Sequence, residues 1–146
     1  MFLVNRKVTF DYHILHTWEA GISLLSTEIK SIRAGTGDIS RAYAMINSRH
    51  VWLMNMNIPK YRFGGYINHQ DLRNRRLLLH RREINKMVKS YDKSYTLIPT
   101  RVYFNARNYL KVTLALCIGK KLFDKRRAIK EREQKREKLR VTKRYI

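Results

Sequence analysis

The sequence is poor in cysteine, in acidic residues and in long apolar runs, and these scarcities exclude several classes of protein. The single cysteine, Cys117, among 146 residues excludes an internal disulfide framework and a zinc site built from cysteines. No apolar run approaches the roughly 20 residues that a transmembrane helix requires. Hydrophobic residues make up 44% of the chain, which is enough for a real core and excludes wholesale disorder. The length fits one folded domain with a tail.

The few acidic residues leave a large positive charge that is unevenly distributed. The 32 Lys and Arg against 11 Asp and Glu give a formal net charge of +21, which predicts a polyanionic partner. Residues 1–118 hold 19 basic and 7 acidic residues, net +12, and residues 119–146 hold 13 and 4, net +9. An acidic protein or an anionic membrane are alternatives, but a membrane-binding tail needs a wide apolar face that residues 119–146 lack. RNA or DNA is therefore the leading partner.

Strand patterns dominate the first 118 residues. Aromatic, β-branched and alternating residues predict a strand that begins over 10–18 and is bent by Gly21 before residues 22–24. They also predict a hairpin of strands 42–46 and 51–58 around the turn 47–50, and two further strands, 95–104 and 109–118, around the turn 105–108. Helical spacing predicts a helix from Leu25 to Arg33 and another around residues 84–91, with His80 as its N-cap and Glu83 in the capping-box position. At least five short strands and two short helices predict a mainly β fold with short helices, an OB-like closed or partly open β-barrel.

Two segments lack these patterns. Residues 60–71 are polar and contain two glycines, which predicts a mobile loop. After Gly119 the hydrophobic periodicity stops, so we expect a barrel domain over residues 1–122 and a basic tail over residues 123–146. The tail has high helix propensity, but its charge opposes compaction. We therefore expect it to be disordered when free and helical on a polyanion.

Two basic clusters are candidate phosphate contacts. Five arginines fall within ten residues, at Arg73, Arg75, Arg76, Arg81 and Arg82. Guanidinium groups match phosphate oxygens in a bidentate way, although a solvated charge run is the alternative. The second cluster runs from Gly119 through Lys120 and Lys121 to residues 124–127, and it lacks the pattern of a Walker loop. Asp124 in this cluster either orients a neighbouring arginine or caps the tail helix.

A few other side chains bear on RNA recognition. Glu19 lies in an otherwise basic region, where a carboxylate can accept hydrogen bonds from base amino groups. A surface ion pair with a nearby Lys or Arg is the alternative. Tyr12, Tyr61 and Tyr66 are candidate platforms for base stacking. We expect no metal site and no cofactor, since His13 and His16 would point to opposite faces of a strand.

The acidic residues form no catalytic cluster, and Cys117 in mid-strand is expected to be buried and inert, so we predict that the protein is not an enzyme. A small nuclease that uses carboxylates and magnesium is the enzymatic alternative that this argument disfavours.

Several motifs, in order, resemble the SsrA-binding protein (SmpB) family over essentially the whole chain. They are residues 5–7, 10–12, 18–21, 28–35, 73–84 and 119–126, followed by the basic stretch 129–133. The sequence departs from the family pattern at residues 8–10, 117–118 and at Phe123. The resemblance implies an OB-type barrel that binds the tRNA-like domain of transfer-messenger RNA and delivers it to stalled ribosomes for trans-translation. The tail would sense the vacant mRNA channel.

The resemblance and the charge clusters together give the predicted site. The RNA-binding set is Tyr12, Glu19, Ala20, Gly21, Arg73, Arg75, Arg76, Leu78, His80, Gly119, Lys120 and Lys121. The set for the ribosome is Asp124, Lys125, Arg126, Ile129, Lys130, Arg132, Lys135, Arg136, Lys143 and Arg144. The implied partners are transfer-messenger RNA and small-subunit ribosomal RNA at the decoding site and mRNA channel, with no membrane. The implied location is a bacterial-type cytoplasm or an organelle of bacterial origin. A general OB-fold single-stranded RNA binder or a ribosomal protein is the alternative.

Overall fold

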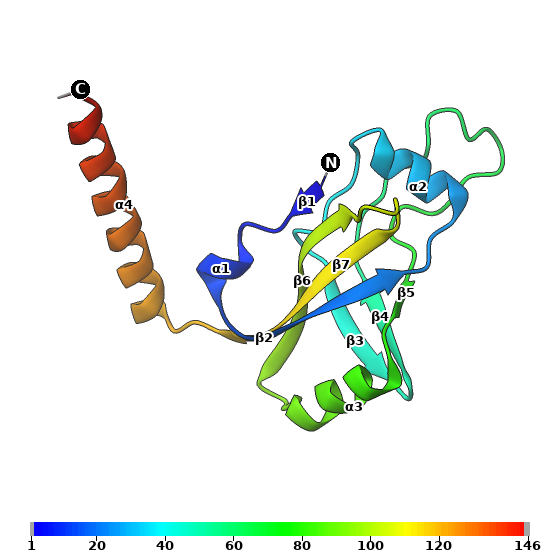
Figure 1. Cartoon of the computed structure of the whole chain (residues 1–146), viewed down its shortest axis with the longest axis horizontal. Coiled ribbons are helices and arrows are strands. Elements are labelled where there is room, and N and C mark those ends of the chain that lie inside the picture. Colours follow the sequence, from blue (N-terminus) through cyan, green and yellow to red (C-terminus); the bar gives the residue numbers. More distant parts are fainter. Residues whose placement is uncertain (1, 145–146) are drawn as a thin grey trace.

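A computed structural model describes residues 2–144, and the chain is mainly β with seven strands and four helices over that range. The elements in chain order are β1 (Phe2–Val4), α1 (Val8–Asp11), β2 (Tyr12–Ile22), α2 (Ser26–Arg33), β3 (Tyr43–Asn47), β4 (His50–Met54), β5 (Arg75–Leu78), α3 (Arg81–Ser90), β6 (Tyr95–Phe104), β7 (Leu110–Gly119) and α4 (Leu122–Arg144). The predicted fold class is therefore confirmed (Figure 1).

The strands pair in a ring. The order is β1-β6-β3-β4-β5-β2-β7, and β7 also pairs with β6, which joins six strands in a circle and leaves β1 outside it. The β2–β7 and β6–β7 ladders are long, whereas β3 meets β6 at one pair of residues, Ala44 and Leu97. The β2–β5 seam is also short, with Gly21 opposite Leu78. The sheet is therefore ring-like rather than an evenly closed barrel.

Alternating side chains of the strands fill the ring. On β7, Leu110, Val112, Leu114 and Leu116 are buried in the main core, as the alternation predicts. Burial of each such side chain stabilises the fold by about 1.5–3 kcal/mol. Cys117 faces a second small cluster with Val8 and Ile98 and is fully buried, as expected from the sequence. Burial raises the pKa of its thiol to about 11, so the thiol stays protonated and unreactive at neutral pH.

A glutamate side chain caps the N-terminus of α2 and another caps that of α3. Glu28 accepts a hydrogen bond from the backbone N–H of Leu25 at 2.8 Å, and Glu83 accepts one from the backbone N–H of His80 at 2.9 Å. Each satisfies a donor that the first helical turn leaves without a partner. The predicted role of Glu83 in the capping box is confirmed for its own hydrogen bond, the one from the His80 backbone to the Glu83 carboxylate.

Two strand boundaries differ clearly from the sequence predictions, and the strand β1 was not predicted. Residues 8–11 form the short helix α1, so the strand begins at Tyr12 and then runs through Gly21 without a break. The second strand of the predicted hairpin ends at Met54, because Asn55 adopts a left-handed backbone with φ of 55° that turns the chain out of the ladder. The strand β5, inside the arginine cluster, was not predicted.

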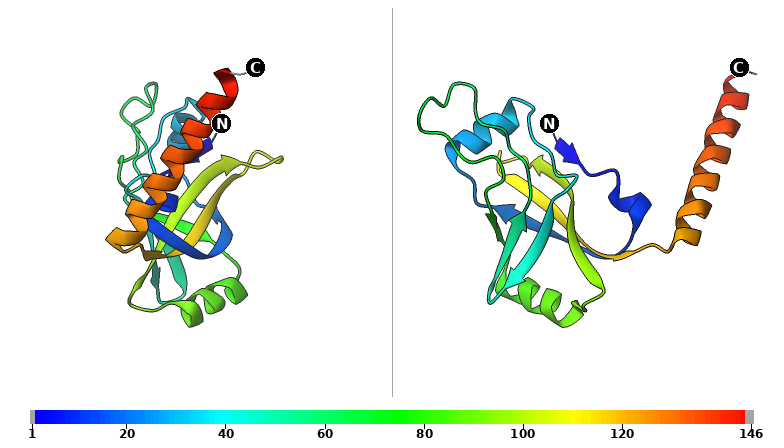
Figure 2. Two further views of the ribbon diagram at one scale, coloured as in Figure 1. Left: turned by 90° about the vertical axis from the view of Figure 1, so that its left-hand side faces the viewer. Right: turned by 180° about the vertical axis from the view of Figure 1, so that it is seen from behind.

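The helix α4 projects from the barrel and contacts it near its root (Figure 2). Lys120 Nζ donates to the carbonyl oxygen of Thr9 at 2.8 Å, and the Arg132 guanidinium lies 5.6 Å from the ring centroid of Phe10. The i, i+4 pair that the sequence predicts at Arg127 and Glu131 is present, with a 3.0 Å hydrogen bond. The helical form of the tail is thus observed, whereas its disorder in the free chain and the domain boundary stay predictions. No helix within residues 2–144 is both long and apolar enough to cross a membrane.

Candidate nucleic-acid interface

A buried ion cluster fixes the framework of the candidate interface. Glu28 on α2 has no exposed side-chain surface and accepts from Arg75 Nε at 2.8 Å and from Arg73 Nη2 at 2.7 Å. Burial alone would raise the pKa of Glu28. Hydrogen bonds from Arg73 and the Leu25 N–H, with the charge of Arg75, instead hold it below its ordinary value. The cluster ties the start of α2 to β5.

The same cluster bears on the sequence prediction for Arg75. Arg75 is fully buried, and its other donors reach the carbonyl oxygens of Met56 at 2.6 Å and Asp71 at 3.1 Å. Its guanidinium is engaged inside the fold and has no exposed surface here, so a role of Arg75 in RNA binding stays a prediction. Arg73 is partly exposed but is engaged with Glu28. Arg76, the next residue of β5, points outward, because strand residues alternate between faces, and Arg81 and Arg82 of α3 are also exposed.

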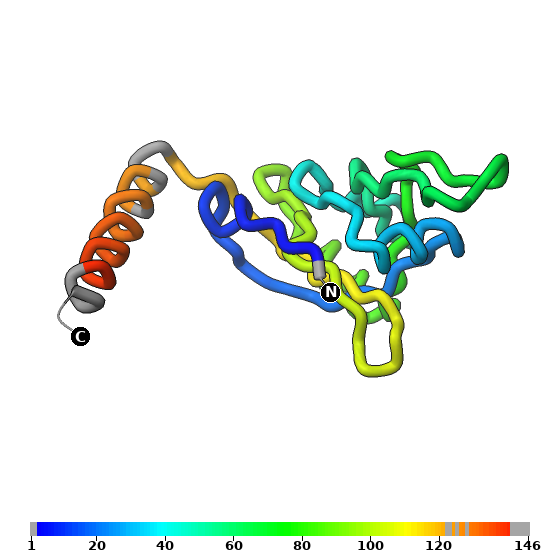
Figure 3. The backbone as a smooth tube through the Cα atoms, turned by 90° about the horizontal axis from the view of Figure 1, so that it is seen from above, coloured from blue at the N-terminus to red at the C-terminus, as the bar shows by residue number. Residues whose placement is uncertain are grey.

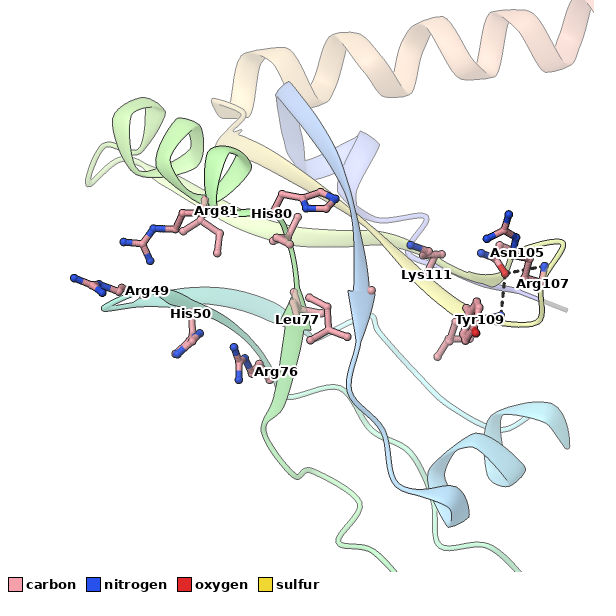
Figure 4. A pocket seen from close by; sticks show the side chains of 15 residues that line it. Arg49, His50, Arg76, Leu77, His80, Arg81, Asn105, Arg107, Tyr109 and Lys111 are labelled. Carbon is pink, nitrogen blue, oxygen red and sulfur yellow. Dashed lines mark hydrogen bonds between the residues drawn. The ribbon is translucent and has the colours of Figure 1, made fainter.

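Arg76 opens onto a groove of about 710 Å³ beside the β2–β5 seam (Figure 4). Its lining consists of Gly21, Arg49, His50, Arg76, Leu77, Leu78, Leu79, His80, Arg81, Ile84, Asn105, Arg107, Tyr109, Leu110 and Lys111. Four arginines, one lysine and two histidines are in this set, and none of the fifteen residues is acidic. A concave surface of one charge sign concentrates the field on a ligand of opposite charge.

Two turns add cations to those of β5, α3 and β7. Arg49 comes from the β3–β4 turn, next to His50 at the start of β4, and Arg107 and Tyr109 come from the β6–β7 turn on the opposite wall (Figure 4). The second turn is rigid, because Asn105 Oδ1 accepts from the backbone N–H groups of Arg107 at 3.0 Å and Tyr109 at 2.8 Å. The Tyr109 side chain is exposed and gives the groove an aromatic face.

A glycine lies between these walls. A Cβ added at Gly21 would lie 3.2 Å from Leu78 Cβ, closer than an ordinary contact. Glycine therefore lets β2 and β5 pair closely and leaves backbone accessible in the groove. Leu78 and His80, both exposed, continue this surface from β5 into the start of α3. The structure thus brings together Gly21, Arg76, Leu78 and His80 from the predicted set.

Glu19 lies next to the groove on β2 and is half exposed. Its carboxylate accepts a hydrogen bond from the Tyr103 hydroxyl, and Lys111 Nζ lies 3.8 Å from Glu19 Oε1. The hydrogen bond to Glu19 raises the pKa of Tyr103. The carboxylate therefore has the surface partners that the sequence alternative described, and its role toward a base stays a prediction.

Other predicted residues lie outside the groove. Ala20 is fully buried in the core, and Tyr12 is half buried against the small cluster at α1. Gly119 pairs with Tyr12 at the far end of β2, where the Lys120 backbone N–H also donates to the carbonyl oxygen of Asp11 at 2.9 Å. Tyr12, Gly119 and Lys120 are near the start of α4, whereas Ala20 lies beside Gly21, so the predicted RNA-binding set divides between two places on the molecule.

The predicted tail residues lie on α4. Asp124 Oδ2 is 3.4 Å from His13 Nε2, which links the start of α4 to β2. The two predicted roles of Asp124, orienting an arginine and capping the helix, stay predictions. Several predicted positions are exposed, at Arg126, Ile129, Lys130, Arg132, Lys135 and Arg136. The side chains predicted at Lys125, Lys143 and Arg144 are outside the described part of the chain.

Sequence reasoning missed the groove residues Arg49, His50, Arg107, Tyr109 and Lys111. Both turns were visible in the sequence as breaks between strands. Their convergence on one groove depends on the ring, which local patterns do not encode. The one indication of these residues in the sequence was a cation in each of two predicted turns, Arg49 and Arg107.

The ring-like sheet, the groove whose lining residues include no acid and the basic helix beyond it are the features of a small, mainly β protein that binds RNA. The SmpB protein family model matches residues 2–144. The chain therefore belongs to the SmpB family.

Curated relatives agree with this assignment. The chain is 50% identical over 138 residues to an SsrA-binding protein of Sphingomonas elodea, covering 94% of this chain and 86% of the relative. It is 48% identical over 142 residues to an SsrA-binding protein of Chlorobaculum tepidum, covering 97% and 90%. A chain in a solved structure described as "tmRNA-SmpB: a journey to the center of the bacterial ribosome" matches with a TM-score of 0.70 and 42% identity, covering 83% of this chain and 85% of that one.

Proposed function

We propose that this protein binds the tRNA-like domain of transfer-messenger RNA and delivers it to stalled ribosomes for trans-translation, which rescues the ribosome and tags the stalled peptide. The groove beside the β2–β5 seam holds the tRNA-like domain. The protein acts in the cytoplasm as a binding partner and not as an enzyme. Membership of the SmpB family and the names of its relatives support this proposal.

The observation that carries the proposal is the groove itself. It combines five Lys and Arg side chains with an exposed tyrosine and no carboxylate among the residues that line it. Phosphates of a folded RNA are held by such cations, while an aromatic ring and a close backbone approach at Gly21 add contacts to bases and sugars. A double-stranded region and an adjacent loop, as in a tRNA shape, offer both kinds of contact.

The helix α4 has a separate role in the proposal. It carries cations on its exposed surface and makes few contacts with the barrel, so it is free to enter a tunnel of ribosomal RNA phosphates. An mRNA in that channel would exclude the helix sterically and would compete for the same surface. The tail thereby reports whether the channel is vacant, at the decoding site of the small subunit.

The first experiment tests the groove. Arg49→Ala/Arg76→Ala removes two exposed cations, and Lys93→Ala removes one exposed cation outside the groove. Each lost phosphate contact lowers the slope of log K against log salt by about 0.7–0.9, so we expect the double variant to lose about 1.4–1.8. Binding of a tRNA-like domain transcript between low and moderate salt measures this slope. An unchanged slope in the double variant contradicts the proposed groove.

The second experiment separates the barrel from the tail. Deleting residues 124–146 leaves the groove intact, so the affinity for the tRNA-like domain transcript is expected to stay unchanged. Peptide tagging on stalled ribosomes is expected to be lost. An equal loss of RNA affinity and of tagging would show that the two parts do not divide the work.

A competition assay distinguishes this function from general binding of single-stranded RNA. The groove walls are fixed by turns and a seam, which suits a structured RNA. We therefore expect unlabelled homopolymer RNA to displace the tRNA-like domain transcript poorly. Equal displacement by poly(U) would favour the general OB-fold binder.

A further inference from the structure

A second aromatic and basic surface lies outside the groove. Three side chains in the connection between β4 and β5 are almost fully exposed. Their accessible areas relative to a fully exposed reference residue are 77% for Phe63, 109% for Tyr66 and 88% for Ile67. We call these three side chains the loop tip. Large apolar side chains that are almost fully exposed cost hydration free energy, and three together on one loop mark an interaction site.

The loop that carries the tip is held at its base. Asn68 Oδ1 accepts from the backbone N–H of Tyr61 at 3.1 Å, and Asn68 Nδ2 donates to the carbonyl oxygen of Tyr61 at 2.8 Å. The buried His69 has its ring nitrogens 2.9 Å from the carbonyl oxygen of Ile58 and 2.9 Å from Thr27 Oγ1. These contacts fix where the tip is presented, so ordering it on a ligand costs less conformational entropy.

The chemistry around the tip suits an RNA. Residues 60–70 include Lys60 and Arg62 and no acidic residue. The Arg62 guanidinium lies 5.7 Å from the ring centroid of Phe63, and Lys30 Nζ of α2 lies 5.7 Å from that of Tyr61. Cations interleaved with exposed rings are the arrangement by which proteins hold unpaired bases and the phosphates between them. An apolar protein partner would gain nothing from this charge.

The loop lies on the same side of the barrel as β5. Figures 1 and 3 show α4 at one end of the molecule and the loop, beyond α2, at the other. A ligand in the groove beside β5 is therefore closer to the loop tip than a ligand on α4. A tRNA-shaped RNA is longer than the barrel is wide, and it exposes unpaired bases in its loops.

From this placement we propose that the loop tip is a second contact for the tRNA-like domain, on which Tyr66 stacks an unpaired base while Lys60 and Arg62 hold the adjoining phosphates. This inference rests on the proposed function of the groove. It adds a contact that reads single-stranded structure in an RNA whose folded part occupies the groove. Phe63 and Ile67 are the other exposed apolar side chains of the loop tip.

Binding of a tRNA-like domain transcript to the full chain tests the contact. Removing the ring on which one base stacks weakens binding by about 5- to 100-fold. We therefore expect Tyr66→Ala to raise Kd within that range. Tyr66→Phe keeps the ring and should bind like the unaltered protein. Tyr91→Ala removes an exposed tyrosine at the end of α3, outside the groove, and should also leave Kd unchanged. None of these side chains supports the core.

A second variant tests the fixed geometry of the loop. A Cβ at Gly64 would come within 2.5 Å of Asn68 Nδ2, so Gly64→Ala must displace the side chain that holds the loop. We expect weaker binding although every aromatic ring remains. Tyr66→Trp supplies a direct readout, because an indole stacked on a base loses fluorescence when the transcript is added, beyond any change in the unaltered protein.

Three results would overturn the inference. Binding by Tyr66→Ala equal to that of the unaltered protein, with no quenching in Tyr66→Trp, removes the loop tip from the RNA interface. Unchanged transcript binding with weakened binding to purified ribosomes would assign the tip to the ribosome instead. In both cases the groove variant Arg49→Ala/Arg76→Ala still reports on the proposed function. No transcript binding by the unaltered protein would defeat both proposals together.

Discussion

The barrel and the helix α4 use the same residue type in opposite ways. In the barrel, Arg75 is fully buried and gives its hydrogen bonds to Glu28 and to backbone carbonyl oxygens. On α4, the Arg127 guanidinium is mostly exposed and pairs with the equally exposed Glu131. Burial converts the first arginine into part of the framework, whereas exposure leaves the second available to a polyanion.

The comparison shows that the number of arginines says little about the size of a binding surface. The three arginines on and just before β5 have different roles. Arg73 and Arg75 hold Glu28, whereas Arg76 faces the groove. None of the described side chains of α4 is buried. Stability experiments should therefore respond to changes in the barrel and be nearly silent to equivalent changes on α4.

The largest effect is expected from Glu28→Gln. This change leaves the charge of Arg75 buried without a counterion, which costs about 3–5 kcal/mol of unfolding free energy. The matched change Glu131→Gln on α4 removes one exposed pair and should cost less than about 0.5 kcal/mol. Urea unfolding followed by the fluorescence of Trp18 and Trp52 measures both. Equal effects of the two changes would contradict the contrast between the regions.

Acid pH should weaken the barrel through the same carboxylate. The pKa of Glu28 is lower in the fold than its ordinary value of 4.5, so its contribution to stability is fully present above 4.5 and is lost as pH falls through the folded pKa. We expect the unfolding free energy of the unaltered protein to fall over this range and that of Glu28→Gln to fall less.

A second acidic side chain, Asp38, keeps the stability of Glu28→Gln dependent on pH in acid. Hydrogen bonds from Ser40 lower the pKa of Asp38 as well, which gives a smaller loss of stability in acid. The variant Asp38→Asn should therefore retain most of the acid dependence. A profile for Glu28→Gln that matches the unaltered protein would remove Glu28 as the main acid-sensitive group.

A small effect on stability is expected at the seam. In Gly21→Ala the new Cβ lies 3.2 Å from Leu78 Cβ, so the two strands must separate by a few tenths of an ångström. We expect a loss of about 1 kcal/mol or less in unfolding free energy, within the usual range for small overpacking. Transcript binding should fall more than stability does, because the same methyl group enters the groove. Thermal unfolding and transcript affinity, measured together, check this.

The sequence predicted the parts of the fold that local patterns encode. The alternation along β7 and the helical spacing before Ser90 matched the structure, because each depends on residues close in the chain. The strand β5 was missed because it is four residues long and half of it is arginine, a composition that a polar loop shares. Its strand character comes from pairing with β4 and β2, which are distant in the sequence.

The candidate site was predictable in part for the same reason. Gly21, Leu78 and His80 came from the resemblance to the family and do line the groove. Arg75 was assigned to RNA because a run of arginines looks exposed when no buried acid can be seen nearby in the chain. Its partner Glu28 lies 47 residues earlier, and only the tertiary structure brings them together.

The composition of β5 has a consequence for how its register is fixed. The strand reads Arg-Arg-Leu-Leu, with Arg75 facing Glu28 inside the sheet and Arg76 facing the groove. A shift by one residue that brings Arg76 to the place of Arg75 would again put an arginine against Glu28 and a leucine in the core. The side chains of β5 alone therefore do not exclude this shift, and its pairing with β4 and β2 has to set the register.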